Sequence, residues 1–79
     1  MAKRMVHLIF PQHLIKRPVI YSMALKYDVV PNVRRAKVTE TVGEMLLELD
    51  GPRGRLEKAV EYLTRRGIRV EPVVGDVIE

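Results

Sequence analysis

The order in which the spacing of apolar residues changes along the chain is the strongest constraint on its fold. Apolar residues at every second position indicate a half-buried strand, and apolar residues at every third or fourth position indicate a helix. The sequence shows these patterns in the order strand, helix, strand, strand, helix, strand. The predicted segments are residues 3–10, 13–27, 29–39, 44–50, 52–66 and 68–74.

Two strand–helix–strand units joined by a hairpin predict an α+β domain. Each unit needs a right-handed crossover. Together they give the ferredoxin-like βαββαβ arrangement, a four-stranded antiparallel sheet with both helices on one face. A proline cannot donate a hydrogen bond to a neighbouring strand, so Pro31 and Pro72 place the second and fourth strands at the edges of the sheet. The first and third strands are then central.

The same periodicities predict the core. Pro18 and Pro52 suit the first turns of the two helices, and Gly67 suits the position just after the second helix. The residues expected to face inward are Val6, Leu8, Phe10, Met45, Leu47 and Leu49 on the central strands, Ile20, Met23, Ala24 and Tyr27 on the first helix, and Leu56, Ala59, Val60 and Leu63 on the second.

A chain of 79 residues has room for one domain, which we assign to residues 1–79, with a core at about 4–74 and a tail at 75–79. A domain of this size buries only about 60–65% of its unfolded surface, so its core alone is marginal. The chain has no Cys, which excludes disulfides, thiolate zinc sites and iron–sulfur clusters. With two His and no clustered carboxylates we expect neither a metal nor a cofactor, and self-association is the expected compensation.

The sheet face that the helices leave uncovered is the predicted interface. Met5, His7 and Ile9 of the first strand point to this face, together with Leu46, the apolar exception on the outward side of the third strand. An uncovered face that carries apolar side chains marks an interaction surface. We therefore expect a homodimer that uses these four residues.

The charge distribution leaves a further possibility open. Residues 1–37 hold eight Lys and Arg against one Asp, a net charge of +7, whereas residues 38–79 carry a net charge of −3. A basic half attracts anions or nucleic acid. The uncovered face, however, has no aromatic side chain on the central strands and carries Glu44 and Glu48, so RNA recognition through stacked bases is not expected.

The sequence does not point to an enzyme. Its single Ser, Ser22, lies within the first predicted helix, and no nucleophile, base and carboxylate are arranged for catalysis. No apolar run approaches the roughly 18 residues of a membrane span, and the basic N-terminus lacks the long apolar stretch of a secretory signal. We therefore expect a non-catalytic cytoplasmic protein.

The second strand contains the most informative polar residues. Asparagine is disfavoured in strands, so Asn32 needs an explanation. On an edge strand its side-chain amide is free to bind an amino-acid headgroup or to form hydrogen bonds across a dimer interface. The alternative is that Asn32 is simply a bulge or turn residue. Arg34 and Arg35 are adjacent, so a regular strand would point one of them at the helices. Either a bulge turns that side chain outward or its stem extends past the edge.

Taken in order, several short segments make the chain resemble the NIL domain, a small domain of bacterial methionine-import ABC transporter ATPases that also occurs in proteins with ferredoxin-type clusters. The family is named after an Asn-Ile-Leu stretch, which here reads Asn32-Val33-Arg34. The segments that carry the resemblance, over about residues 4–74, are Leu8 to Pro11, Lys16 to Tyr21, Asn32 to Ala36, Met45 to Gly51, Ala59 to Leu63, and Gly67 with Ile68.

The resemblance implies a regulatory domain that pairs with a second copy and binds methionine near the interface. It implies that Asn32 contacts the ligand and that Val33 forms an apolar wall, while Arg34 replaces an apolar residue and offers a bidentate partner for a carboxylate. The predicted function is thus sensing of methionine or a related sulfur-containing amino acid. The alternatives are docking by edge-strand pairing to a transport or sulfur-metabolism protein, and binding of anions or nucleic acid by the basic half.

Overall fold

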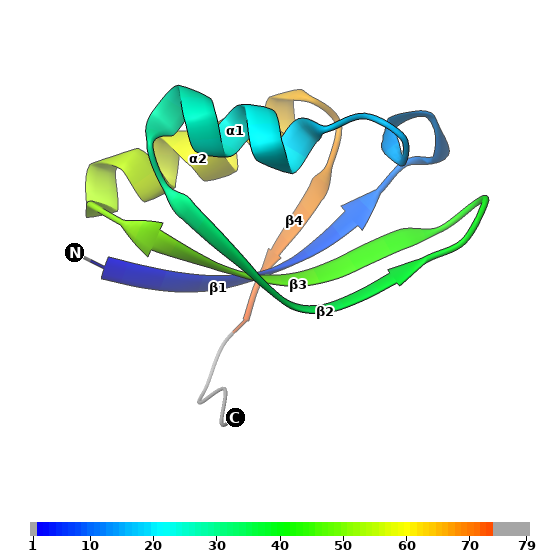
Figure 1. The fold of residues 1–79 in the computed structure, drawn as a ribbon, viewed down its shortest axis with the longest axis horizontal. Helices are drawn as coiled ribbons and strands as arrows, with labels where there is room; N and C mark the ends of the chain where they lie inside the picture. Colours follow the sequence, from blue (N-terminus) through cyan, green and yellow to red (C-terminus); the bar gives the residue numbers. More distant parts are fainter. Residues whose placement is uncertain (1, 74–79) are drawn as a thin grey trace.

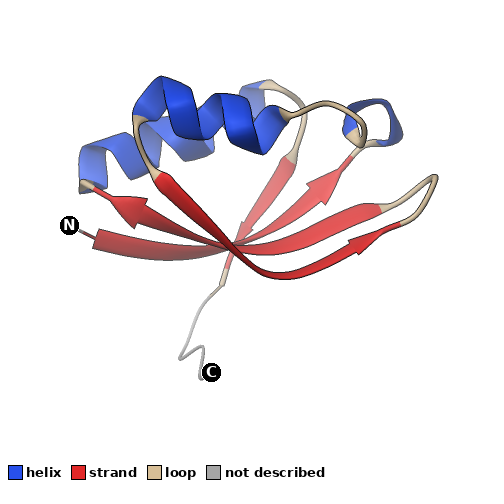
Figure 2. Cartoon of the chain, in the orientation of Figure 1, coloured by secondary structure: helices blue, strands red, loops and turns tan. Residues whose placement is uncertain are grey.

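The computed structural model describes residues 2–73 and confirms the predicted α+β architecture. Four antiparallel strands form one sheet in the order β2-β3-β1-β4, and both helices lie on the same face of that sheet (Figures 1 and 2). The elements are β1 (Ala2–Phe10), a short 3₁₀ helix η1 (Gln12–Leu14), α1 (Val19–Tyr27), β2 (Val30–Val38), β3 (Gly43–Gly51), α2 (Arg53–Arg65) and β4 (Arg69–Pro72). The proline-containing strands β2 and β4 are the two edges, as predicted.

The central pair of strands fixes the register of the whole sheet. β1 and β3 pair along nine residues each, from Ala2 opposite Gly51 to Phe10 opposite Gly43. β4 pairs only with the segment of β1 from Val6 to Ile9. β2 pairs with β3 along its length, with a shift of register between Val33 and Arg35.

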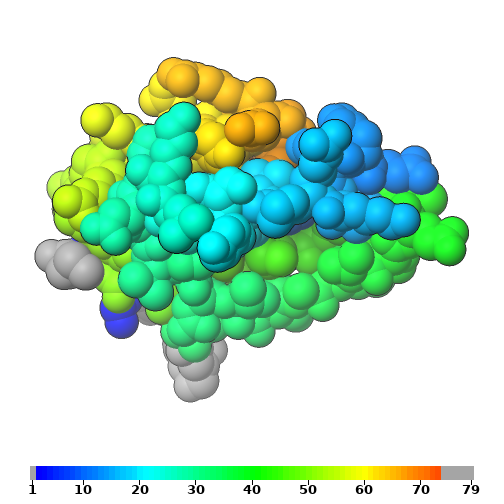
Figure 3. All heavy atoms as spheres, turned by 45° about the horizontal axis from the view of Figure 1, so that its top comes forward, coloured from blue at the N-terminus to red at the C-terminus, as the bar shows by residue number. Residues whose placement is uncertain are grey.

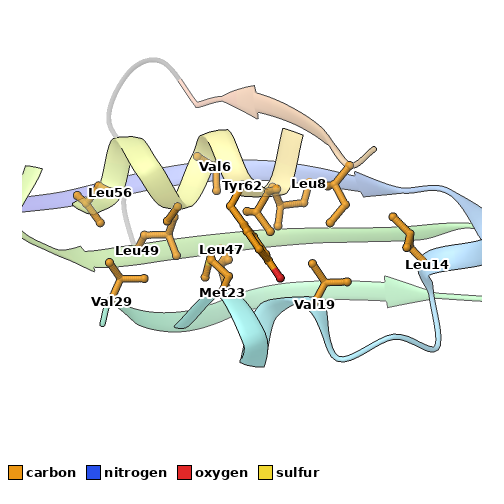
Figure 4. Close-up of a cluster of buried hydrophobic side chains, with 13 residues drawn as sticks. Val6, Leu8, Leu14, Val19, Met23, Val29, Leu47, Leu49, Leu56 and Tyr62 are labelled. Carbon is orange, nitrogen blue, oxygen red and sulfur yellow. The ribbon is translucent and has the colours of Figure 1, made fainter. Parts of the chain in front are cut away.

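The core lies between the helices and the inner face of β1 and β3 (Figure 4). Two buried residues of the helices were not predicted. Tyr62 of α2 is buried and packs edge-on against Tyr27 of α1, and Val19 of α1 is also buried. The predicted Val60, like Ile20 and Ala24, is partly buried and packs against the core. The buried residues are Val6, Leu8, Leu14, Val19, Met23, Val29, Leu47, Leu49, Leu56, Ala59, Tyr62, Leu63 and Ile68.

The ends of α1 differ from the expectation because of its flanking residues. Pro18 immediately precedes the helix rather than lying in its first turn, and the chain upstream forms η1 instead of continuing a helix from residue 13. A proline disfavours helical geometry in the residue before it, so the helix begins only after Pro18. At the other end Asp28 adopts a left-handed conformation with φ 53°.

The second helix follows the predicted pattern more closely. Gly67, at φ 96°, follows the C-terminal cap residue as expected, whereas Pro52, like Pro18, precedes its helix rather than lying in the first turn. The last strand is shorter than predicted, since β4 ends at Pro72, and the predicted tail at 75–79 lies outside the described residues. Within residues 2–73 no helix is both long and apolar enough to cross a membrane.

Candidate functional site

The candidate site comprises the sheet face opposite the helices, called here the open face, and the adjoining outer edge of β2. Pairing of the strands arranges the side chains of the open face in rows that cross the sheet. His7 lies opposite Leu46, and the four predicted interface residues are all half-buried on this one face. The rows, from β2 toward β4, are Lys37, Glu44, Ile9 and Arg69; Arg35, Leu46, His7 and Glu71; and Asn32, Glu48 and Met5.

Carboxylates on both neighbouring strands flank His7. Its Nδ1 lies 3.1 Å from Oε1 of Glu71 on β4, and its Nε2 lies 3.4 Å from Oε1 of Glu44 on β3. Arg69 in turn lies 3.2 Å from the other carboxylate oxygen of Glu71. The open face therefore carries ion-paired side chains beside the predicted Met5, Ile9 and Leu46.

A β-bulge in the middle of β2 determines where its arginines point. Val33 lies opposite Leu47 and Arg35 opposite Leu46, so Arg34 is the additional residue in the strand. Both arginines reach the open face: Arg35 shares a row with Leu46, and the guanidinium of Arg34 donates to Oε1 of Glu48 at 3.1 Å. Of the two solutions predicted for the adjacent arginines, the bulge is the one that the chain adopts.

The bulge brings two of the three predicted ligand-binding residues together and separates the third. Asn32 lies opposite Glu48, the same carboxylate that receives Arg34, so both lie on the open face. Val33 lies opposite the buried Leu47 and therefore on the helix side of the sheet, where it remains 51% exposed because β2 is an edge. Asn32 and Arg34 thus share one surface, and Val33 borders the other side of the same edge.

Hollows adjoin β2 on both sides of the sheet. One, of about 230 Å³, lies on the open face, where His7 and Leu46 are flanked by Arg35, Lys37 and Glu44. The other, of about 140 Å³, is lined mainly by apolar side chains from the start of α1 and the facing strands. Its lining includes Phe10, Ile15, Val19, Tyr21, Val38 and Met45. The sequence patterns did not indicate either hollow.

The side of the molecule formed by α1 and β2 carries most of the exposed apolar side chains among residues 2–73. Tyr21 and Leu25 on α1 are 66% and 65% exposed, and Val30, Val33 and Val38 on β2 are also more than half exposed. Figure 3 shows both elements on one face of the molecule, with a hollowed strip between them. We call these five residues the α1–β2 flank. Sequence reasoning did not identify this surface; of its five residues it singled out only Val33, as an apolar wall of the ligand site.

Comparison with known proteins gives a consistent picture. The sequence model of the NIL domain matches residues 4–72. The chain is 28% identical over 76 residues to the methionine import ATP-binding protein MetN of Halalkalibacterium halodurans, which covers 91% of the chain. It is 34% identical over 59 residues, 70% of its length, to methionine import ATP-binding protein MetN 2 of Acinetobacter baylyi. The aligned parts are 22% and 17% of those relatives, so the chain spans about a fifth of their length.

A solved structure supports the fold. The C-terminal domain of an ABC transporter ATP-binding protein from Enterococcus faecalis superposes with a TM-score of 0.79 at 19% sequence identity. The match covers 92% of this chain and 86% of that one. In the part of the chain that the structure describes, no three His, Cys, Asp or Glu residues come together in a way that could hold a metal ion.

Proposed function

The chain belongs to the NIL domain family, and on that premise we propose that it is a regulatory, non-catalytic domain that binds methionine or a related sulfur-containing amino acid where two copies meet. The relatives that it matches are named as methionine import proteins, which suggests the ligand class. The proposed location is the β2 edge, because Asn32 lies there with one side of its strand unpaired in residues 2–73.

The observation that carries this proposal is the grouping of Asn32, Arg34 and Glu48. A free amino acid has a carboxylate and an ammonium group a few ångströms apart. Its binding site therefore needs hydrogen-bond donors for the carboxylate and acceptors for the ammonium group. The Asn32 amide offers both, the arginines at the bulge offer charged donors, and Glu48 offers a carboxylate. Val33 lies on the helix side of the same edge. It therefore contacts the ligand only if the ligand or a second copy extends past the edge to that side.

Isothermal titration calorimetry of the full chain with an amino-acid panel tests the ligand. The panel contains methionine, homocysteine and cysteine, with norleucine as the apolar analogue that lacks sulfur. We expect methionine or homocysteine to bind, and N32A to weaken that binding about tenfold through the lost hydrogen bonds. The control T41A, at the exposed tip of the β2–β3 hairpin, leaves affinity unchanged. Absence of binding by every member of the panel would refute the ligand proposal.

A second candidate function rests on the unpaired outer edge of β2, which is nine residues long. Such an edge accepts a strand from another protein. This candidate predicts that the chain captures a transport or sulfur-metabolism protein, identified by mass spectrometry. It also predicts that R35E/K37E abolishes capture while the charge-matched R53E/K58E on α2 retains it. Equal capture by both variants would contradict docking at β2.

A further inference from the structure

We propose that the outer surface of the helix layer binds an acidic segment of another protein. The contacting residues are three exposed cations, Lys26 of α1 with Arg65 and Arg66 at the end of α2, which we call the helix patch. The two helices lie side by side over the sheet (Figure 1), with α1 next to β2 and α2 next to β4. Because the helix patch lies where α1 and α2 meet, it is separate from the ligand site proposed at the outer edge of β2.

The second helix is a basic element in an acidic half of the chain. Residues 38–79 carry a net charge of −3, yet residues 53–66, which contain α2 and its cap, hold five Lys and Arg against two Glu. Part of this positive charge is neutralised within the domain, since Arg55 lies 3.0 Å from Asp28 and Arg65 is paired with Glu61. The net charge of this half therefore conceals a local positive surface on α2.

The aromatic rings of two tyrosines position the cations of the helix patch. The Nζ atom of Lys26 lies 5.4 Å from the centroid of the Tyr62 ring, and the guanidinium carbon of Arg66 lies 4.9 Å from the same centroid. Tyr27 packs edge-on against Tyr62, and its ring centroid lies 5.8 Å from Lys26. A ring attracts a cation without cancelling its charge. Lys26 and Arg66 form no ion pair within residues 2–73, so both are positioned and still charged.

This positioning favours the binding of a carboxylate. Long basic side chains lose conformational freedom when they are held by a partner, which weakens binding. The Tyr62 ring is buried and therefore fixed, so the cations that rest on it have less freedom to lose. A guanidinium such as that of Arg66 can donate two parallel hydrogen bonds to one carboxylate. An adjoining hollow of about 230 Å³, whose lining includes Tyr27, Glu61 and Arg65, has room for a side chain of the partner.

The surroundings of the helix patch favour a protein over a nucleic acid or a membrane. Exposed Glu57 and Glu61 interrupt the cations of α2, whereas tight binding to a phosphate backbone needs several cations together. The buried Tyr62 is not accessible for stacking on a base. A helix that lies on a lipid surface needs exposed apolar side chains, and among the described residues α2 has no large one. A folded protein can place carboxylates opposite the cations and leave the two Glu unopposed.

Fluorescence anisotropy of the full chain with a labelled peptide of alternating Glu and Ser tests the proposal. The neutral control is a Gln and Ser peptide of the same length. We expect the Glu peptide to bind at low salt and the Gln peptide not to bind. We expect K26Q/R66Q to weaken this binding about tenfold, because two charge contacts are lost. The variant R35Q/K37Q removes the same charge from β2 and is expected to keep the wild-type affinity.

Two outcomes would overturn the helix patch as the binding surface. One is absence of binding to the Glu peptide at low salt. The other is an equal loss in K26Q/R66Q and R35Q/K37Q, because binding would then follow net charge alone. K26R/R66K separates charge from packing on Tyr62, since it keeps both cations. We expect this variant to retain most of the affinity, and a loss as large as that of K26Q/R66Q would contradict a charge-driven contact.

Further measurements decide the kind of partner. Tighter binding to a single-stranded oligonucleotide or to phosphatidylglycerol vesicles than to the peptide, lost in K26Q/R66Q, would overturn the assignment to a protein. Self-association in sedimentation velocity that is lost in K26Q/R66Q would make a second copy of the chain the occupant and overturn it as well. N32A, which alters only the proposed ligand site, is expected to bind the Glu peptide as the wild type does.

Discussion

Arg34 on β2 is held by Glu48 on β3, with its guanidinium 3.1 Å from the carboxylate, although the strand pattern alone would have pointed one of the two adjacent arginines at the helices. The side chains of the pair are 29% and 16% exposed, so the contact lies partly out of solvent. The bulge thus converts an unfavourable cation on an edge strand into a cross-strand ion pair beside Asn32.

The Arg34–Glu48 contact is expected to couple the two strands energetically. In a double-mutant cycle with R34A, E48A and the double variant, we expect a coupling energy of about 0.5–1 kcal/mol, as for a partly exposed ion pair. Urea unfolding of the four chains measures it. Strict additivity of the single effects would mean that the contact does not stabilise the fold.

Neighbouring leucines on opposite faces of β3 give a direct check of the sheet's orientation. Leu47 is fully buried, whereas Leu46 is half-buried on the open face. We expect L47A to lower the free energy of unfolding by about 3 kcal/mol through lost burial and a residual cavity. L46A is expected to lower it by about 1 kcal/mol or less. Similar losses in both variants would contradict the assignment of the two faces.

Replacing the glycines near the two ends of α2 by alanine is expected to change the stability of the fold in opposite directions. A Cβ atom meets open space at both Gly54 and Gly67, so crowding does not distinguish them. Gly67 has φ 96°, which strains any residue with a side chain, and G67A is expected to cost about 1–2 kcal/mol. Gly54 lies within α2, and G54A is expected to add about 0.5–1 kcal/mol of stability. Thermal unfolding of both variants measures the difference, and equal signs would contradict the cap geometry.

The basic N-terminal half is expected not to bind nucleic acid tightly. Among the cations of this half, Arg34 is paired with Glu48 of β3. Glu44, another carboxylate of β3, lies opposite Lys37, so acidic side chains adjoin the basic ones of β2. Tight binding to phosphates requires several cations that release counterions together. We expect no gel shift with single-stranded RNA or duplex DNA at physiological salt, whereas a salt-dependent shift lost in R35Q/K37Q would reverse this expectation.

The local patterns of the sequence were sufficient to predict the architecture. Periodicity identified the strands and helices, and Pro31 and Pro72 placed the two edge strands correctly because a missing amide hydrogen is a property of the residue itself. Tyr62 was missed as a core residue, although it lies three positions after the buried Ala59 and therefore on the same side of α2. Its burial depends on the partner ring of Tyr27 from the other helix.

The candidate site depended on tertiary structure to a much greater extent. The sequence alone determined that an Asn, two Arg and a Lys lie on one edge strand, and that Met5, His7, Ile9 and Leu46 share a face. Only the fold decided that His7 lies between Glu44 and Glu71, residues far apart in the chain, and that a bulge turns both arginines outward. The physical reason is that strand register, which local periodicity leaves undetermined, decides which side chains meet across a sheet.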